Sequence, residues 1–305
     1  MNENQLSRYG AIAKAYEINP QAKVFFVAPS TATWKENFLN VFPPDADGVV
    51  RVHTTIAAAL LNCVANRGDL ILVLPGYTET RTTALTLNVA GVKILGLGEG
   101  TLRPTITGNG TIDCVNITAA NVTLEHFHFP APDTDNQTSV INIAGVAGVT
   151  IKDITGIGSQ TAKNVVDMIT IVAGSNDLLI ENVRFYNTTV AVNSFISFEG
   201  ACSRITVRDF YAYGEVATAG LIDGATITHL ILERVNIATT GTTIPAALLN
   251  NNPIGLALSC RWAGTSTTLA NNCDLGNAMR LFDNLVLEET NNSAQGALIP
   301  PVDVD

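Results

Sequence analysis

A short hydrophobic pattern recurs along most of the chain at nearly constant spacing. In each copy the first, third and sixth residues are apolar, and the fourth is mostly charged. Successive copies start 30, 27, 29, 27, 25, 26 and 29 residues apart, and a period of this length indicates a solenoid. The clear copies begin at Val92, Val122, Val149, Leu178, Ile205 and Leu230, and weaker ones begin at Leu256 and Leu285.

Each copy predicts a short strand that ends in a corner. The first and third positions share one face of a strand, so the step from the third to the sixth implies a bend after the fourth or fifth residue. A second recurring segment precedes the copies and ends in glycine, which suits a corner that a Cβ would forbid. It occurs at Ile141–Gly145, Thr170–Gly174, Ile196–Gly200 and Leu221–Gly224. Turns of 25 to 30 residues leave no room for a full helix in each repeat. The pattern therefore predicts an all-β fold, a right-handed parallel β-helix.

The first 50 residues differ from the rest and predict an N-terminal arm. They contain one short apolar run, Val24–Ala28, followed by an aromatic-bearing stretch. Exposed aromatic side chains are common at protein interfaces. Trp34, Phe38 and Phe42 are therefore candidates for anchoring the arm to a partner protein, and the alternative is that they pack over the end of the main body. The β-helix itself is expected over 51–305, with coils from about 70 to 290.

A capping helix is expected at about 54–66, just before the first strong strand. Thr54 or Thr55 is a suitable N-cap, and the following residues are rich in Ala and Leu. The terminal repeats of a solenoid need such a cover. Arg67-Gly68-Asp69, at the end of this helix, spells an integrin-binding tripeptide, but its position between a helix and a strand predicts a turn.

The fourth positions of successive copies alternate in charge and predict a structural ladder. If the coils stack at the strand spacing of about 4.8 Å, these side chains form one outward column. Each exposed pair stabilises by only about 0–1 kcal/mol, yet a shift of one coil removes every attractive neighbour. The alternative is a chance alternation. The expected column comprises Glu125, Lys152, Glu181, Arg208, Glu233, Ser259 and Glu288.

The composition argues against two classes of partner. The chain has 305 residues, a net charge of −10 and a pI near 4.8, and an acidic surface repels nucleic acid. It contains no apolar run of about 18 residues, so no membrane span is expected. Five widely spaced cysteines without a CxxC predict buried thiols in a reducing compartment, and a bridge between Cys260 and Cys273 is the alternative.

The sequence offers only weak candidates for chemistry. Glu199 and Asp223 each precede a corner glycine, so neighbouring coils could stack them as the carboxylate pair that glycoside hydrolysis needs. Solvated corner residues are the favoured alternative. His126, His128 and Asp153 could approach one another as metal ligands, although exposed polar side chains are the default. No cofactor is predicted.

Two aromatic pairs, Phe185-Tyr186 and Phe210-Tyr211, fall at similar points on adjacent coils. Such a cluster is either a stack that spans core and surface or a platform for a glycan. The stack is favoured, because the chain has only two Trp and six Tyr residues and sugar grooves usually display more.

Several segments resemble the right-handed parallel β-helix proteins of tailed bacteriophages. The resemblance lies in Arg67–Glu79, Gly91–Gly98, Asn121–Glu125 and the ending Gln295–Pro301, and it covers about residues 54–301. It implies a component of a virus particle, commonly trimeric: a capsid decoration, a head fibre or a tail spike.

The resulting expectation is a non-enzymatic, homotrimeric decoration or cement protein on the outer capsid surface, made in the host cytoplasm. It is expected to bind the major capsid protein or other virion proteins through residues 1–50. Trimerisation would cover apolar outer faces such as Val140–Val149. The alternatives are a receptor-binding tail spike or head fibre and, third, a polysaccharide-degrading enzyme.

Overall fold

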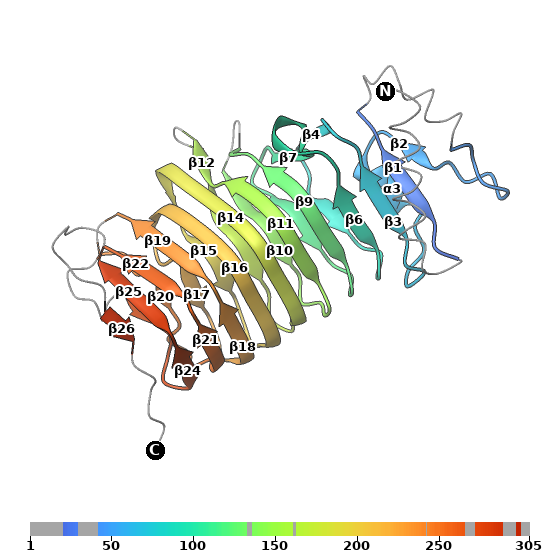
Figure 1. Cartoon of the computed structure of the whole chain (residues 1–305). Helices are drawn as coiled ribbons and strands as arrows, with labels where there is room; N and C mark the ends of the chain where they lie inside the picture. The colour runs from blue at the N-terminus through green and yellow to red at the C-terminus, as the bar shows by residue number, and fades with distance from the viewer. Residues whose placement is uncertain are drawn as a thin grey trace.

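The computed structural model describes residues 21–29, 42–132, 136–160, 163–241, 243–265, 272–288 and 297–299. In these residues the protein is nearly all β and forms a parallel β-solenoid of about nine turns. Figure 1 shows the strands stacked along one axis, from β1 at the N-terminal end to β24, β25 and β26 at the other. The predicted fold class is confirmed.

The strands pair in three columns, which form three faces of the solenoid. The first face contains β1 (Val24–Val27), β3 (Leu70–Val73), β6 (Lys93–Gly96), the first parts of β9 (Thr123–Phe129), β11 (Thr150–Ile157), β14 (Asn176–Val192) and β16 (Cys202–Val216), then β18 (Ile227–Glu233), β21 (Ile254–Leu258) and β24 (Met279–Phe282). The second face contains β4 (Thr78–Arg81), β7 (Thr105–Gly108), the second parts of β9, β11, β14 and β16, then β19 (Asn236–Thr240), β22 (Arg261–Gly264) and β25 (Asn284–Glu288).

The third face is a separate sheet. It contains β5 (Leu85–Leu87), β8 (Asp113–Ile117), β10 (Gln137–Ile143), β13 (Lys163–Ile171), β15 (Ser194–Phe198), β17 (Leu221–Asp223), β20 (Ala247–Leu248) and β23 (Cys273–Asp274). The small strands β2 (Val52–His53) and β12 (Ser159–Gln160) pair with β1 and β13, and β26 (Ala297–Ile299) pairs antiparallel with β25. The second recurring segment of the sequence, the one that ends in glycine, therefore forms strands of the third face.

The corner between the first and second faces is a single residue in the left-handed region of backbone space. In the five clear copies from Val122 to Leu230 this residue is the fifth, so the predicted bend is confirmed. The corner residues are His126, Asp153, Asn182, Asp209 and Arg234, with φ between 51° and 67°. A second left-handed column lies just before or near the start of the first-face strands, at Gly91, Asn121, Gly148, Asp177, Arg204 and His229.

Inward side chains from all three faces form one continuous core. Its largest members include Phe127, Phe185, Phe198, Phe210 and Trp262. The expectation of an apolar outer face over Val140–Val149 is wrong, because Val140 and Val149 are 1% and 0% exposed. Val140, Ile141 and Val149 all belong to the main core.

The solenoid begins within the segment expected to be an arm. β1 pairs in parallel with β3 over its whole length, from Val24 opposite Leu70 to Val27 opposite Val73. β1 is completely buried because Phe25 and Val27 belong to the main core, whereas Val24 and Phe26 belong to a second apolar cluster against which Phe42 packs. The boundary expected at residue 51 therefore lies too late in the chain.

The capping helix is present but shorter than predicted. α3 covers Ile56–Leu60, and the Thr55 side chain accepts a hydrogen bond from the Ala58 amide at 3.1 Å. The helix contacts β1, β2, β3 and β5 and buries Ile56 and Leu60 at the N-terminal end of the core. It does not reach residue 66, because the Val64 amide donates to a carboxylate instead of to a helical carbonyl.

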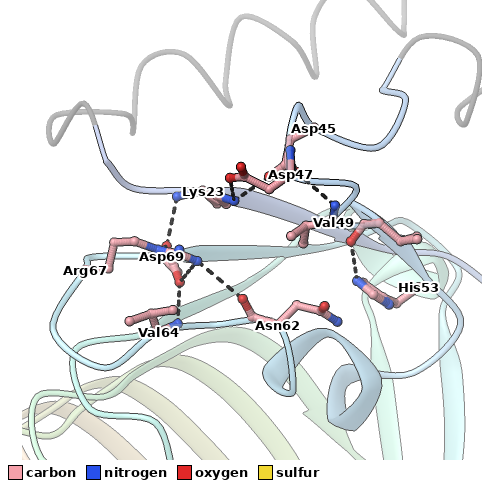
Figure 2. A network of polar contacts seen from close by, with 10 residues as sticks. Lys23, Asp45, Asp47, Val49, His53, Asn62, Val64, Arg67 and Asp69 are labelled. Atoms are coloured by element: carbon pink, nitrogen blue, oxygen red, sulfur yellow. Dashed lines mark hydrogen bonds and ion pairs between the residues drawn. The ribbon is translucent and has the colours of Figure 1, made fainter.

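That carboxylate belongs to Asp69, which organises the N-terminal coil (Figure 2). Its side chain is 0% exposed and accepts from the Lys23 amide and the Val64 amide at 2.8 Å each. The Arg67 guanidinium donates to both carboxylate oxygens at 2.6 and 2.7 Å. Lys23 also pairs with Asp45 through its ammonium group. The Arg67-Gly68-Asp69 tripeptide is thus a turn whose carboxylate is inaccessible to a receptor, as predicted.

All five cysteines are free thiols, so the alternative of a bridge between Cys260 and Cys273 is not observed. Burial raises the pKa of the Cys114 thiol to about 12 and that of Cys260 to about 11. Thiols with such pKa values are poor nucleophiles at neutral pH. Among the described residues, no helix has the length and apolar character needed to cross a membrane.

Candidate functional site

The charge ladder is present over five coils of the first face. Lys152 lies opposite both Glu125 and Glu181, and Arg208 lies opposite both Glu181 and Glu233. Glu181 forms ion pairs with Arg208 at 2.8 Å and with Lys152 at 3.5 Å. The alternating column therefore places attractive neighbours on both sides of Glu181.

The last members of the predicted ladder are wrong. Glu233 lies opposite Leu258, which in turn lies opposite Phe282. Glu288 lies opposite Gly264 on the second face. The copy that seemed to begin at Leu256 is one residue out of register, because β18 and β21 pair through an irregularity that sets Leu230 opposite Gly255. The copy at Leu285 is on the wrong face, because β25 repeats the apolar alternation of a first-face strand.

Replacing Glu181 by Lys should lower the free energy of unfolding by roughly 1–2 kcal/mol, because two attractive neighbours become two repulsive ones. The side chains are partly exposed, so salt should screen the effect. Chemical denaturation at low ionic strength and in 1 M salt measures it. A loss that is the same in both conditions would contradict an electrostatic origin.

Glu199 and Asp223 do not form the expected carboxylate pair. Asp223 lies opposite Phe198, one residue away from Glu199, because β17 reaches its glycine one residue sooner. Asp223 is buried and accepts hydrogen bonds from the backbone and side-chain amides of Asn251, whereas Glu199 is exposed. The prediction of a stacked pair is therefore wrong.

A different polar column, which the sequence did not single out, runs along the third face. Asp113 lies opposite Ser139, which lies opposite Asp167, which lies opposite Ser194. The serine hydroxyls donate to Asp113 at 2.8 Å and to Asp167 at 2.6 Å. Burial raises the pKa of Asp167 above its usual value, although Ser194 and Asn193 donate to its carboxylate.

This raised pKa has a consequence for stability against pH. The folded state holds the Asp167 proton more tightly than the unfolded chain does, so stability falls as the pH rises from about 4 through the folded pKa. Asp167→Asn keeps an oxygen acceptor for both donors and should make this fall shallower, while Asp223, whose pKa burial also raises, keeps its own share. Unfolding measured from pH 4 to pH 8 tests it.

Asp177→Asn is the matched control, because hydrogen bonds from Arg204 lower the pKa of Asp177. That substitution should remove a contribution of the opposite sign, one present above pH 4 and lost in acid. If the Asp167→Asn variant loses stability between pH 4 and pH 8 as steeply as the parent chain, Asp167 is not the group responsible.

The two histidines and Asp153 do not converge on a metal position. The His126 ring pairs with Asp153 through one nitrogen and with the Gly98 carbonyl through the other, at 2.5 Å. His128 hydrogen-bonds the Thr155 hydroxyl at 2.9 Å instead. Burial, reinforced by Arg103, lowers the pKa of His128. In the described parts of the chain, no three His, Cys, Asp or Glu side chains gather as a metal site.

A candidate site is a groove of about 930 Å³ that begins at the corner column and extends over the second face. It crosses β11, β14, β16 and β19, which lie side by side in Figure 1. A smaller hollow of about 290 Å³ continues from it and shares Thr155, Asn182 and Arg184. We call the two hollows together the second-face groove. Its polar and aromatic lining includes His128, Thr155, Asn182, Arg184, Tyr186, Asp209, Tyr211, Arg234 and Asn236.

The aromatic pairs divide between the core and this groove. Phe185 and Phe210 are buried and pack edge to face, with ring centroids 5.9 Å apart. Tyr186 and Tyr211 are 48% and 49% exposed and line the groove. Tyr186 also stacks on Tyr213 with centroids 5.7 Å apart. The cluster is a core-and-surface stack, as favoured, and its exposed half faces an open groove.

Of the three aromatic residues expected to anchor the arm, only Phe42 belongs to the part of the chain that the structure describes. Trp34 and Phe38 lie outside the described residues. Phe42 packs against the small apolar cluster at the N-terminal end, with its ring 4.4 Å from that of Phe26. Phe42 therefore follows the alternative expectation, in which it packs over the end of the main body.

Together, the stacked coils and the groove define a parallel β-solenoid that presents a ligand-sized hollow along one face. Comparison with protein-family models, with curated protein sequences and with solved structures found no match for the chain.

Proposed function

We propose that this chain is a non-enzymatic structural component of a bacteriophage particle, a decoration or cement protein on the outer head surface. The observation that carries the proposal is the continuous solenoid of about nine turns, which combines with the resemblance of its repeats to phage β-helix proteins. α3 covers the core at one end and β26 pairs with the last second-face strand at the other. Such a body suits permanent exposure on a particle, since covered ends limit edge-to-edge aggregation.

The proposal includes self-association into a homotrimer. The second copy would contact the exposed apolar side chains on β18, β21 and β24, where the charge ladder gives way to Leu258 and Phe282. Ile231, Ile254 and Phe282 there are 38%, 51% and 65% exposed. Sedimentation of the full chain should give about three times the 32.2 kDa mass of one chain, and Phe282→Asp should lower it. A monomer at micromolar concentration would refute the trimer.

A receptor-recognising fibre or tail spike is the second candidate, and the second-face groove favours it. Gold-labelled antibodies on particles from a phage that encodes this chain separate the two roles. Dense labelling over the head supports a decoration protein, whereas labelling confined to the tail supports a spike. Particles that carry no label would overturn both.

A further inference from the structure

We propose that the second-face groove binds an acidic oligosaccharide, with Arg184 receiving its carboxylate and Tyr186 and Tyr211 packing against its sugar rings. This site goes beyond the structural role proposed above and does not depend on it. A failure of the binding test would leave the particle assignment untouched.

The unpaired charge of Arg184 points to an anionic ligand. The other arginines in the groove have acidic partners: Arg234 forms two hydrogen bonds to Asp209 at 2.7 and 2.8 Å, and Arg103 pairs with Asp153 at 2.6 Å. Glu99, at the rim of the smaller hollow, lies 3.7 Å from the His126 ring. Arg184 is exposed and belongs to both hollows, and its guanidinium has no ion pair or hydrogen bond among the residues that the structure describes. A carboxylate is the natural bidentate partner of a guanidinium.

The rest of the lining suits a saccharide. Sugars present hydroxyl groups at their edges and C–H groups on their faces, so they need amide and hydroxyl partners beside flat rings. Asn182, Asn236 and Thr155 supply the polar partners, and the two half-exposed tyrosines supply the rings. Burial and Arg103 lower the pKa of His128, which leaves its ring neutral at pH 7 and able to hydrogen-bond hydroxyls.

The register makes the groove long enough for a chain of sugars. His128, Thr155, Arg184, Tyr211 and Asn236 are successive members of one outward column. Four steps of the strand spacing span about 19 Å along the axis. The net charge of −10 disfavours a long polyanion such as nucleic acid, so we commit to an oligosaccharide with few charges.

The test is an array of oligosaccharides in which uronic-acid and sialic-acid members are matched by neutral ones, probed with the full chain. We expect retention of acidic members only. Calorimetry with the best-retained acidic oligosaccharide should then give at least about tenfold weaker binding for Arg184→Ala, which is the value of one charge-assisted hydrogen bond. Arg280→Ala makes the same change of charge at an exposed site on β24, outside the groove lining, and should leave the affinity unchanged.

The tyrosines separate saccharide binding from capture of a bare anion. Tyr186→Ala and Tyr211→Ala should each weaken binding about tenfold. Leu61→Ala, which removes an exposed apolar side chain outside the groove, should not. Retention of no acidic glycan, equal retention of neutral ones, or unchanged affinity in the Arg184 or tyrosine variants would each overturn the proposal. Unchanged thermal unfolding of the variants confirms that they remain folded.

Discussion

Replacing Asp69 by Ala should lower the free energy of unfolding by about 3–5 kcal/mol, because it removes one partner of a buried ion pair. The carboxylate is 0% exposed and accepts four hydrogen bonds: one from the Lys23 amide just before β1, one from the Val64 amide and two from the Arg67 guanidinium. Without it, two backbone amides and a largely buried cation lose their acceptor in a place that water reaches poorly. A loss of this size is a large part of the 5–15 kcal/mol that stabilises an ordinary domain.

Asp177→Asn is the control for that experiment. Asp177 also receives two hydrogen bonds from one guanidinium, that of Arg204, but both side chains are about half exposed. Asn removes the charge and tolerates the left-handed backbone at this position, so the unfolding midpoint should stay nearly unchanged. Urea denaturation of the two variants beside the parent chain makes the comparison. Equal effects would contradict the central place given to the Asp69 network in the first coil.

The second large effect is expected at Gly214, where adding one methyl group should destabilise the protein by about 3–5 kcal/mol. Gly214 has a φ of 137° and lies opposite Asn187 on the neighbouring coil. A Cβ there would lie 1.8 Å from the Asn187 carbonyl oxygen, so two backbones would have to separate. Because β14 and β16 are the longest strands of the solenoid, the distortion would spread through its centre.

Gly48→Ala is the control that separates the steric clash between coils at Gly214 from the strain of a left-handed backbone. Gly48 has a φ of 77°, and a Cβ there would meet nothing within 4 Å. Its substitution should cost only the roughly 1–2 kcal/mol of the left-handed conformation. Thermal unfolding of Gly214→Ala and Gly48→Ala gives the difference. A Gly214 variant as stable as the Gly48 variant would mean that neighbouring coils do not approach as described.

Side-chain periodicity was enough to predict the coils and their corners, because a strand alternates its faces and a corner interrupts the alternation. The fifth residue of each clear copy, from His126 to Arg234, is the corner. The prediction failed where the pattern was ambiguous. Glu288 was placed on the first face because Leu285, Val286 and Leu287 imitate a first-face strand, and only the backbone course shows otherwise.

The Glu199–Asp223 pair and the second-face groove show what the repeat pattern did not predict. Counting back from glycine assumed equal strand lengths, and β17 is shorter, so Glu199 and Asp223 did not align. The groove could have been found by extending each copy one residue past its sixth position. The seventh residues are its central column: His128, Thr155, Arg184, Tyr211 and Asn236. That Arg184 lacks a partner depends on tertiary placement and could not be predicted.

The stacking of coils at a winding of about 27 residues is tested most directly by disulfide formation between engineered cysteines. Residues 177 and 204 are neighbours on adjacent coils, and residue 229 is one coil further. At about 4.8 Å per coil, the first pair falls within disulfide range and the pair 177 and 229 falls outside it. Mild oxidation of Asp177→Cys/Arg204→Cys, followed by non-reducing electrophoresis, should therefore show an internal bridge that Asp177→Cys/His229→Cys lacks. Bridging of both pairs alike, or of the second pair alone, would contradict the stacked solenoid.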